Sequence, residues 1–478
     1  MNSTNPTSPA NCEPKNVGIR AMELYFPRTY VEQRELEEFD KVSEGKYTIG
    51  LGQQQMAFCG DHEDIASICM TVLTMLLERY EIDPHSIGFC AVGTETLIDK
   101  SKSVKTQLMD LFGDNTDVEG VDVKNACFGG TQALFHAVDW VYANWQTETK
   151  YTCNYIALEL GAFPIRLNYG VKIVLFPGRY AVVVMGDIAI YEPGAARCTG
   201  GVGAFAALIG PDALISFDRG LRATHMTNVW DFYKPIGGGS KEFPVVNGPI
   251  SLTSYMKSLD SAYRAYRQKA MRLQQNCGSL KKLVSCFKLR NELIDFGSND
   301  IKSKLQLSNV VEEVNVNSFK AVMFHSPFCR NVQKAFARLC YLDYLNGAND
   351  HLLNSEQLKP FRSMKLEETY KNRDFMTATL KASEQLWLQK VDPYLLFNKR
   401  VGNMYTPSVF AQLLALFHRS SSLESIRHER ILLFSYGSGA ASAMFSATIC
   451  DNIDDHHSGK KVVEYVIQDV ITYICDFD

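Results

Sequence analysis

The chain has 478 residues, a formal net charge of −4 and 46% hydrophobic residues. This length allows one large domain or two fused units, and the composition is that of a globular protein with a large core. The nearly balanced charge argues against bulk attraction to nucleic acid or to a membrane surface. No apolar run is long enough to cross a bilayer.

The N-terminus and the cysteines indicate a cytoplasmic protein. Residues 1–16 are rich in Asn, Ser, Thr and Pro, and we expect them to be disordered. They lack the apolar core of a signal peptide and the arginines of a mitochondrial transit sequence. The 13 cysteines form no CxxC pair and no His/Cys cluster with zinc spacing, so we expect reduced thiols and no metal site.

Hydrophobic periodicity predicts alternating strands and helices in the first part of the chain. The predicted strands are 17–26, 87–92, 118–123, 180–185 and 202–208, and the predicted helices are 32–39, 65–80, 104–112 and 131–145. After residue 266 the sequence becomes polar and basic, with a helical pattern over 267–290. Beyond it, the predicted strands are 319–324, 394–397 and 431–434, and the predicted helices are 327–345, 412–417 and 440–449.

The two parts of the chain resemble each other, which suggests a duplicated α/β unit with a site between the copies. In each part a strand ends in a polar residue and is followed by a helix that carries two cations. We therefore divide the chain into a first half (17–266), a polar connecting segment (267–317) and a second half (318–478).

Cys127 is the strongest candidate for a reactive residue, because it lies in a tight turn between a predicted strand and a predicted helix. The helix dipole and the unpaired backbone N–H groups at such a turn favour a thiolate and could hold an oxyanion. A buried core cysteine is the alternative. Gly129 and Gly130 favour the first interpretation, since glycine lets a substrate approach the backbone. We therefore expect covalent chemistry on a carbonyl.

Glu95 and His325 follow predicted buried strands, at the edge of the sheet where α/β proteins assemble their sites. A thiolate, a carboxylate and an imidazole would suffice for acyl transfer and for removal of a proton from carbon. The alternatives are a solvated Glu95 and a core histidine at 325. Ser326 and Pro327 are predicted to cap the following helix and to begin it.

Two further features suggest anion binding. Glycines at 437 and 439 could expose backbone N–H groups as an oxyanion hole or a phosphate cradle, or could form a plain turn before a helix. Arg330 and Lys334 lie one turn apart on a predicted helix, where they could meet phosphates or only water.

With these residues in view, the sequence closely resembles the hydroxymethylglutaryl-CoA (HMG-CoA) synthase family of the eukaryotic type. The matching segments are KYTIGLGQ (46–53), VGTETLIDKSKSVKT (92–106), NACFGGT (125–131), GDIAIY (186–191), TGGVGA (199–204), DFYKP (231–235), FHSPFC (324–329), GNMYT (402–406) and FSYGSG (434–439). The resemblance implies the thiolase fold, an α/β architecture of two similar halves in five layers, αβαβα, and a homodimer. It also implies condensation of acetyl-CoA with acetoacetyl-CoA, without a metal or redox cofactor.

The resemblance also implies a role for each motif residue. Cys127 would carry the acetyl group as a thioester, Glu95 would be the general acid/base, and His325 would position and polarise the acetoacetyl carbonyl. Backbone amides at 127 and 438 would stabilise oxyanions. The implied substrate- and CoA-binding residues are Thr199, Ser251, Arg330, Lys334, Asn403 and Ser438. The implied supporting residues are Asp187, Asp231, Tyr405 and Tyr436.

The chain departs from the family pattern in several places. Phe128 replaces a tyrosine, Ala195 an asparagine, Cys198 a proline and Arg330 a lysine. Relative to the family pattern the chain has two extra segments, one at about 150–177 and one within 271–314, and we interpret the first as unspliced or mispredicted sequence. These segments suggest a second hypothesis, as does an end at residue 478, which we expect to leave a sheet edge unpaired. In it, the chain is a catalytically impaired or unstable isoform that keeps the fold and dimerises. A decarboxylating ketoacyl synthase is a further rival, and Glu95 argues against it.

Overall fold

The structure is a computed structural model that describes residues 14–145, 178–234, 243–288, 314–347, 356–420 and 422–450, with side chains described up to residue 275 in the third of these ranges. Most of the N-terminus expected to be disordered, the extra segment 150–177 and the end of the chain beyond 450 lie outside the described residues. The predictions about them, including the unpaired sheet edge, are therefore untested.

Nine strands form one mixed sheet within the described residues. They are β1 (Gly18–Tyr25), β4 (Ile87–Gly93), β5 (Asp122–Val123), β6 (Tyr180–Ala189), β7 (Gly201–Gly210), β8 (Ile215–Met226), β11 (Ala321–Phe324), β12 (Arg430–Gly437) and β13 (Ala441–Ile449). Their order is β11-β12-β13-β8-β1-β7-β6-β4-β5. The two halves join where β1 pairs briefly with β8 at Gly18 and Ile19. A Cβ at Gly18 would lie 1.9 Å from the carbonyl oxygen of Ile215, so this junction requires glycine.

The two halves of the sheet have the same pairing pattern, which confirms the predicted duplication. In the first half, β7 is antiparallel to β1 and β6, and β6 is parallel to β4. In the second half, β13 is antiparallel to β8 and β12, and β12 is parallel to β11. Glu95 and His325 therefore follow equivalent strands, β4 and β11.

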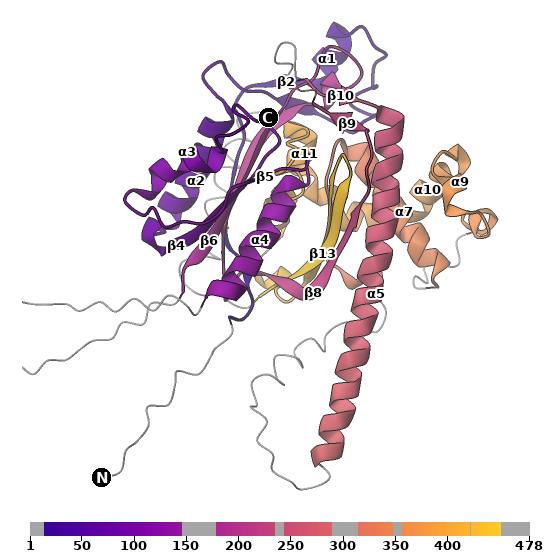
Figure 1. The fold of residues 1–478 in the computed structure, drawn as a ribbon. Helices are drawn as coiled ribbons and strands as arrows, with labels where there is room; N and C mark the ends of the chain where they lie inside the picture. The colour runs from indigo at the N-terminus through magenta and orange to yellow at the C-terminus, as the bar shows by residue number, and fades with distance from the viewer. Residues whose placement is uncertain are drawn as a thin grey trace, which may run out of the picture.

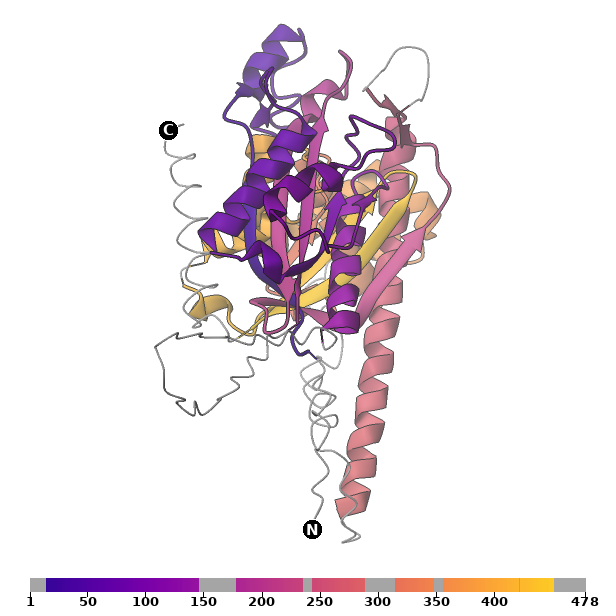
Figure 2. The ribbon, with the colours of Figure 1, turned by 60° about the vertical axis from the view of Figure 1, so that its left-hand side comes forward.

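The two halves of the sheet form two layers of the structure, and helices form the other three (Figures 1 and 2). The central layer contains α4 (Gly129–Asn144), which packs against β4, β6 and β7, and α12 (Ala411–Arg419) contributes side chains to the same apolar core. On one side α2 (Ile65–Arg79) packs against β1, β6 and β7, and on the other α5 (Gly248–Lys288) packs against β8, β13 and α7 (Cys329–Leu345). Figure 1 shows α2, β6, α4, β13 and α5 from left to right, which is the expected αβαβα order.

Contacts across the central layer join the halves. The hydroxyl groups of Thr131 on α4 and Ser435 on β12 are 2.7 Å apart. The ring of Phe135 meets that of Phe445 on β13 edge to face, with centroids 5.1 Å apart. Burying both faces of this layer forms one continuous apolar core that includes strands from both halves.

The remaining elements are short or peripheral. They are the strands β2 (Tyr30–Glu32), β3 (Gln55–Ala57), β9 (Phe232–Tyr233) and β10 (Val245–Val246), and the helices α1 (Gln33–Phe39), α3 (Val104–Leu108), α9 (Leu366–Thr369), α10 (Arg373–Lys390) and α11 (Leu396–Val401). The division into domains stays a prediction, and its boundary at residue 266 falls within α5.

Two predicted elements are wrong, and one is much shorter than expected. Residues 440–449 were predicted as a helix but form β13, which is buried on both faces between β12 and β8, so its side chains show no alternation. Residues 394–397 were predicted as a strand but fall in a 3₁₀ turn and α11, because a short apolar run does not distinguish the two. Of the predicted strand 118–123, Asp122–Val123 is assigned to β5.

Candidate active site

Cys127 lies in a tight turn between β5 and α4, as the sequence predicts. The N–H groups of Phe128 and Gly129 donate to the carbonyls of Asn125 and Ala126, each at 3.1 Å. Ala126 has a φ of 44°, in the left-handed region that residues other than glycine rarely adopt. Such a conformation costs about 1–3 kcal/mol and is typical of residues beside active sites.

Gly129 and Gly130 have a different role from the one predicted. A Cβ at Gly130 would lie 2.8 Å from Sδ of Met185, and one at Gly129 would lie 2.5 Å from the carbonyl oxygen of Val123. A Cβ at Gly93 would in turn lie 2.3 Å from Cα of Gly130. These glycines let α4 pack directly against the strands, and protein atoms fill the space that was expected to admit a substrate.

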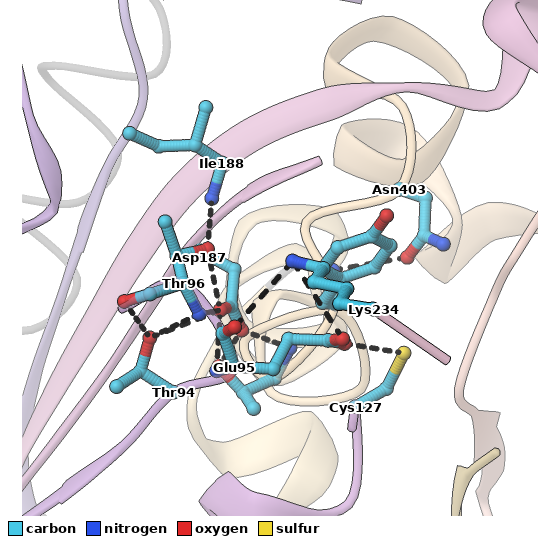
Figure 3. A network of polar contacts seen from close by, with 10 residues as sticks. Thr94, Glu95, Thr96, Cys127, Asp187, Ile188, Lys234 and Asn403 are labelled. Carbon is cyan, nitrogen blue, oxygen red and sulfur yellow. Dashed lines mark hydrogen bonds and ion pairs between the residues drawn. The ribbon is translucent and has the colours of Figure 1, made fainter. Parts of the chain in front are cut away.

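Glu95 is buried and lies beside Cys127, so the alternative of a solvated carboxylate is wrong. Its Oε1 lies 3.5 Å from Sγ of Cys127. Its Oε2 lies 4.0 Å from Nζ of Lys234, which also donates to the carbonyl oxygen of Glu95 at 3.4 Å. Figure 3 shows the carboxylate between the sulfur and the ammonium.

Burial sets the protonation of this pair. The pKa of Glu95 is raised to about 8: burial is the largest cause, the charge of Asp187 adds to it, and Lys234 and Cys127 oppose the rise. Burial also raises the pKa of the Cys127 thiol well above its usual range, with the charge of Glu95 as the next cause. The expected stabilisation of a thiolate is therefore wrong, because desolvation and neighbouring carboxylates outweigh the helix dipole.

Asp187 organises the loop that carries Glu95 (Figure 3). One of its oxygens, Oδ1, accepts from the N–H groups of Glu95 and Thr96 at 2.8 and 3.0 Å. It also accepts from the hydroxyls of Thr94 and Thr96, both at 3.0 Å. The other, Oδ2, accepts from the N–H and hydroxyl of Thr406 at 3.1 and 2.5 Å. This buried carboxylate thus joins the end of β4 to a loop of the second half.

His325 lies at the end of β11, in a fully buried position. Its N–H donates to the carbonyl of Phe434 at 2.8 Å, and its carbonyl accepts from the hydroxyl of Tyr255 at 2.7 Å. Burial lowers the pKa of the imidazole to about 3, so the side chain is neutral at physiological pH. The backbone of His325 is thus fixed on both sides.

The loop 403–408 connects the His325 strand end to the Glu95 strand end. The N–H of Ser326 donates to Oγ of Ser408 at 3.0 Å, and Oγ1 of Thr406 lies 3.0 Å from the carbonyl oxygen of Gly93. Ser326 is not the predicted helix cap, because α7 begins at Cys329 and Phe328 occupies the N-cap position. The backbone of Ser326 serves this loop instead.

The turn Gly437–Gly439 packs against the Cys127 turn. A Cβ at Gly437 would lie 2.4 Å from the carbonyl oxygen of Asn125, and Nδ2 of Asn125 donates to the carbonyl of Ser438 at 3.3 Å. Asp231 holds the turn from behind, accepting from the N–H of Gly439 and the hydroxyl of Tyr436, both at 2.9 Å. The turn leads into β13 and not into the predicted helix.

Asn403 and Tyr405 also belong to this centre. Oδ1 of Asn403 accepts from the N–H of Tyr405 at 3.0 Å, and Tyr405 has a φ of 53°. The ring of Tyr405 meets that of Tyr191 edge to face, at a centroid distance of 6.3 Å. Thr199 is hydrogen-bonded to Ala196 in a short 3₁₀ turn before β7.

The expected substrate-contacting residue Ser251 lies on α5, and the expected CoA-binding residues Arg330 and Lys334 lie on α7. The N–H of Arg330 donates to the carbonyl of Leu51 at 2.8 Å, which places the 46–53 segment beside α7. Burial and the charge of Arg330 lower the pKa of Lys334. Both cations are half-buried.

Among the departures from the family pattern, two are buried and one is exposed. Phe128 is buried beside Gly437, and Cys198 is buried with its thiol 3.5 Å from the carbonyl of Ala195. Ala195 is exposed. Nothing in the structure explains the change to alanine at 195.

Sequence reasoning did not identify Lys234, Thr94, Thr96 or Tyr255 as parts of this centre. Lys234 lies in the DFYKP segment, and its position within that segment was the only available signal. Within the described ranges, no group of three His, Cys, Asp or Glu side chains is arranged to hold a metal ion. The helices of the same ranges include none that is long and apolar enough to span a membrane.

Two family models match the chain. One, described as hydroxymethylglutaryl-coenzyme A synthase N terminal, matches residues 13–159 and 166–214, and the corresponding C-terminal model matches 215–289 and 295–471. The chain belongs to the hydroxymethylglutaryl-CoA synthase family. The two internal gaps in these matches, residues 160–165 and 290–294, lie in the extra segment 150–177 and in the polar connecting segment 267–317.

Individual relatives agree with the family models. The chain is 44% identical to a hydroxymethylglutaryl-CoA synthase of Caenorhabditis elegans, over 91% of this chain and 78% of that protein. It is 43% identical to the cytoplasmic enzyme of Homo sapiens, over 93% and 74%, and 39% identical to the mitochondrial enzyme of Sus scrofa, over 96% and 79%. The structure of MvaS in complex with 3-hydroxy-3-methylglutaryl coenzyme A is similar with a TM-score of 0.70 and 26% identity, covering 96% of this chain and 88% of that one. The expected family, enzyme class and fold are confirmed.

Proposed function

We propose that this HMG-CoA synthase condenses acetyl-CoA with acetoacetyl-CoA and water, giving HMG-CoA and CoA through an acetyl group on Cys127. Family membership supports the overall reaction. The 3.5 Å approach of the Glu95 carboxyl to the Cys127 thiol is the observation that carries the mechanism, because it places a base beside the carbon that must lose a proton.

In the first step, Sγ of Cys127 attacks the acetyl carbonyl, and the thiolate of CoA leaves and takes up a proton. The raised pKa of Cys127 means that the thiol loses its own proton as it attacks. The oxyanion that forms would be stabilised by the backbone N–H groups of Cys127 and Ser438, which belong to turns packed on each other.

In the second step, ionised Glu95 removes a proton from the acetyl methyl group, and the resulting carbanion attacks the ketone carbon of acetoacetyl-CoA. A neutral imidazole at His325 suits this step, because its ring N–H can donate to the ketone oxygen as negative charge develops there. The alkoxide then takes up a proton, and water cleaves the thioester to Cys127 and releases HMG-CoA.

The remaining site residues are proposed to bind and position. Asn403 and Thr199 would contact the acyl groups, and Arg330 and Lys334 on α7 would meet the phosphates of CoA, with Ser251 on α5. Asp187, Asp231, Tyr405 and Tyr436 would hold the loops around Cys127. Arginine at 330 keeps the charge and offers a bidentate fork to phosphate.

We further propose a homodimer without a metal or redox cofactor, located in the cytoplasm. Similar enzymes that are named as cytoplasmic support this location, although an enzyme named as mitochondrial is also similar. Light scattering coupled to gel filtration tests the dimer, since a monomeric mass at working concentration would contradict it.

Incubation of the purified chain with both thioesters tests the reaction. We expect HMG-CoA and CoA in equal amounts, detected by chromatography with mass spectrometry, and an acetyl group on a Cys127 peptide after acetyl-CoA alone. A folded dimer that forms neither would instead support the catalytically impaired isoform. The intact contacts around Glu95, Cys127 and Asp187 do not favour that alternative.

A further inference from the structure

Lys234 follows the short strand β9 and reaches into the centre of the site. Its ammonium lies 4.0 Å from Oε2 of Glu95 and 3.4 Å from the carbonyl oxygen of the same residue. It also lies over the ring of Tyr405, 5.5 Å from the centroid. The Lys234 side chain is about one-quarter exposed, whereas that of Glu95 is almost fully buried.

The two carboxylate oxygens of Glu95 face different partners. Oε1 faces the sulfur of Cys127, and Oε2 faces the ammonium of Lys234. The backbone N–H of Glu95 is held by Asp187. The carboxylate is thus anchored on the side away from the thiol, and the oxygen nearest the acetyl-bearing atom is left to react.

We propose that Lys234 is a positioning residue that anchors Oε2 of Glu95, directs Oε1 at the acetyl group on Cys127, and favours the ionised carboxylate that removes the methyl proton. This inference rests on the proposed function. Lys234 acts through Glu95 and need not touch the substrate.

The charges around Glu95 show why a cation matters here. The groups that face it are Asp187 on β6, Cys127 before α4, Tyr191 after β6, Tyr405 in the loop 403–408, and Lys234. Lys234 is the one cation of this set. Burial and Asp187 hold the pKa of Glu95 up to about 8, and Lys234 is the larger of the two influences that lower it.

The distance also suits this role. At 4.0 Å the pair lies at the limit of an ion pair, so Lys234 shifts the charge balance of Glu95 without a short hydrogen bond to the reactive carboxylate. An opposite charge within about 4–6 Å shifts a carboxyl pKa by roughly 1–3 units.

The test compares Lys234→Gln, which removes the charge, with Lys234→Arg, which keeps it. Lys381→Gln, at an exposed position of α10, is the matched control. For each variant kcat/KM for condensation is measured between about pH 6 and pH 10, and acetylation of Cys127 by acetyl-CoA is followed by mass spectrometry.

We expect Lys234→Gln to move the acid limb of the profile upward by about one pH unit, lowering condensation near pH 7 by about tenfold. Acetylation of Cys127 should persist, because it does not need the ionised Glu95. The profiles of Lys234→Arg and Lys381→Gln should coincide with that of the unaltered enzyme along the acid limb.

An unshifted acid limb in an active Lys234→Gln enzyme would overturn the inference and leave the proposed function standing. If Lys234→Gln does not fold, Lys234→Arg decides, because a displaced limb in that charge-preserving variant contradicts the proposal and an undisplaced one supports it. Absence of HMG-CoA formation by the unaltered chain would instead show that the proposed function is wrong, and the inference would fail with it.

Discussion

Oε1 of Glu95 lies 3.5 Å from Sγ of Cys127, although 32 residues separate them in the chain. Glu95 follows β4 and Cys127 follows β5, and these strands are parallel neighbours. The carboxyl ends of parallel strands meet at one edge of a sheet, so the pairing of β4 with β5 brings the carboxyl and the thiol together.

Replacing the nucleophile tests the covalent step. Cys127→Ser should abolish the acetyl-enzyme and condensation, because a serine hydroxyl is a much weaker nucleophile than a cysteine thiol. Mass spectrometry of the protein after incubation with acetyl-CoA checks this outcome. Cys59→Ser, at a half-buried cysteine elsewhere in the first half, is the control and should still acetylate at Cys127. Turnover by Cys127→Ser would refute the mechanism.

Glu95→Ala separates acetylation from condensation. We expect the variant to acetylate at Cys127 but to lose condensation by about 10²–10⁴-fold, the usual contribution of a positioned general base. Single-turnover acetylation and steady-state HMG-CoA formation are measured on the same preparation. Loss of acetylation as well would mean that Glu95 has been assigned the wrong step.

The condensation rate should depend on pH through Glu95. Its pKa is raised to about 8, and it must be ionised to act as a base, so kcat/KM should increase as the pH increases through about 8. Below that pH the rate should fall about tenfold per unit. A pH profile of initial rates checks this expectation, and a rate independent of pH between about 6 and 8 would contradict it.

The same carboxyl should cost stability at high pH. Because its pKa is higher in the folded chain than the ordinary value of 4.5, Glu95 destabilises the fold increasingly as the pH rises from 4.5 to about 8. Glu95→Gln should therefore raise the free energy of unfolding near pH 9, by up to about 5 kcal/mol, with little change near pH 4.5. Urea denaturation at both pH values measures this difference. Glu384→Gln, exposed on α10, is the control, and a less stable Glu95→Gln enzyme near pH 9 would contradict the prediction.

The substitution Gly437→Ala tests the contact between the two halves of the chain. A Cβ there would lie 2.4 Å from the carbonyl oxygen of Asn125 and 2.5 Å from the backbone nitrogen of Phe128, so Gly437→Ala must move the Cys127 turn. We expect a loss of about 1–3 kcal/mol in stability and a lower acetylation rate. Gly248→Ala is the control, since a Cβ there meets no atom within 4 Å. Equal thermal melting and acetylation in the two variants would show that the turns are not packed this tightly.

The local features of this protein can be predicted from its amino-acid sequence. The apolar periodicity of 65–80 and 87–92 predicts α2 and β4, and the family motifs identify Cys127, Glu95 and His325. Periodicity and turn residues depend on neighbours along the chain, so they are readable without the fold. The family pattern extends this because it records the order of motifs over nearly the whole chain.

Features that depend on the surroundings of a residue in the fold follow from the three-dimensional structure. Residues 440–449 form a strand because β8 and β12 pair with them, and Gly130 serves helix packing because Met185 lies where its side chain would be. The upward shift of the Cys127 pKa follows from desolvation and from the charge of Glu95. The contact of Lys234 with Glu95 joins residues 139 positions apart in the chain. Burial and long-range contacts are properties of the folded chain, so no local pattern encodes them.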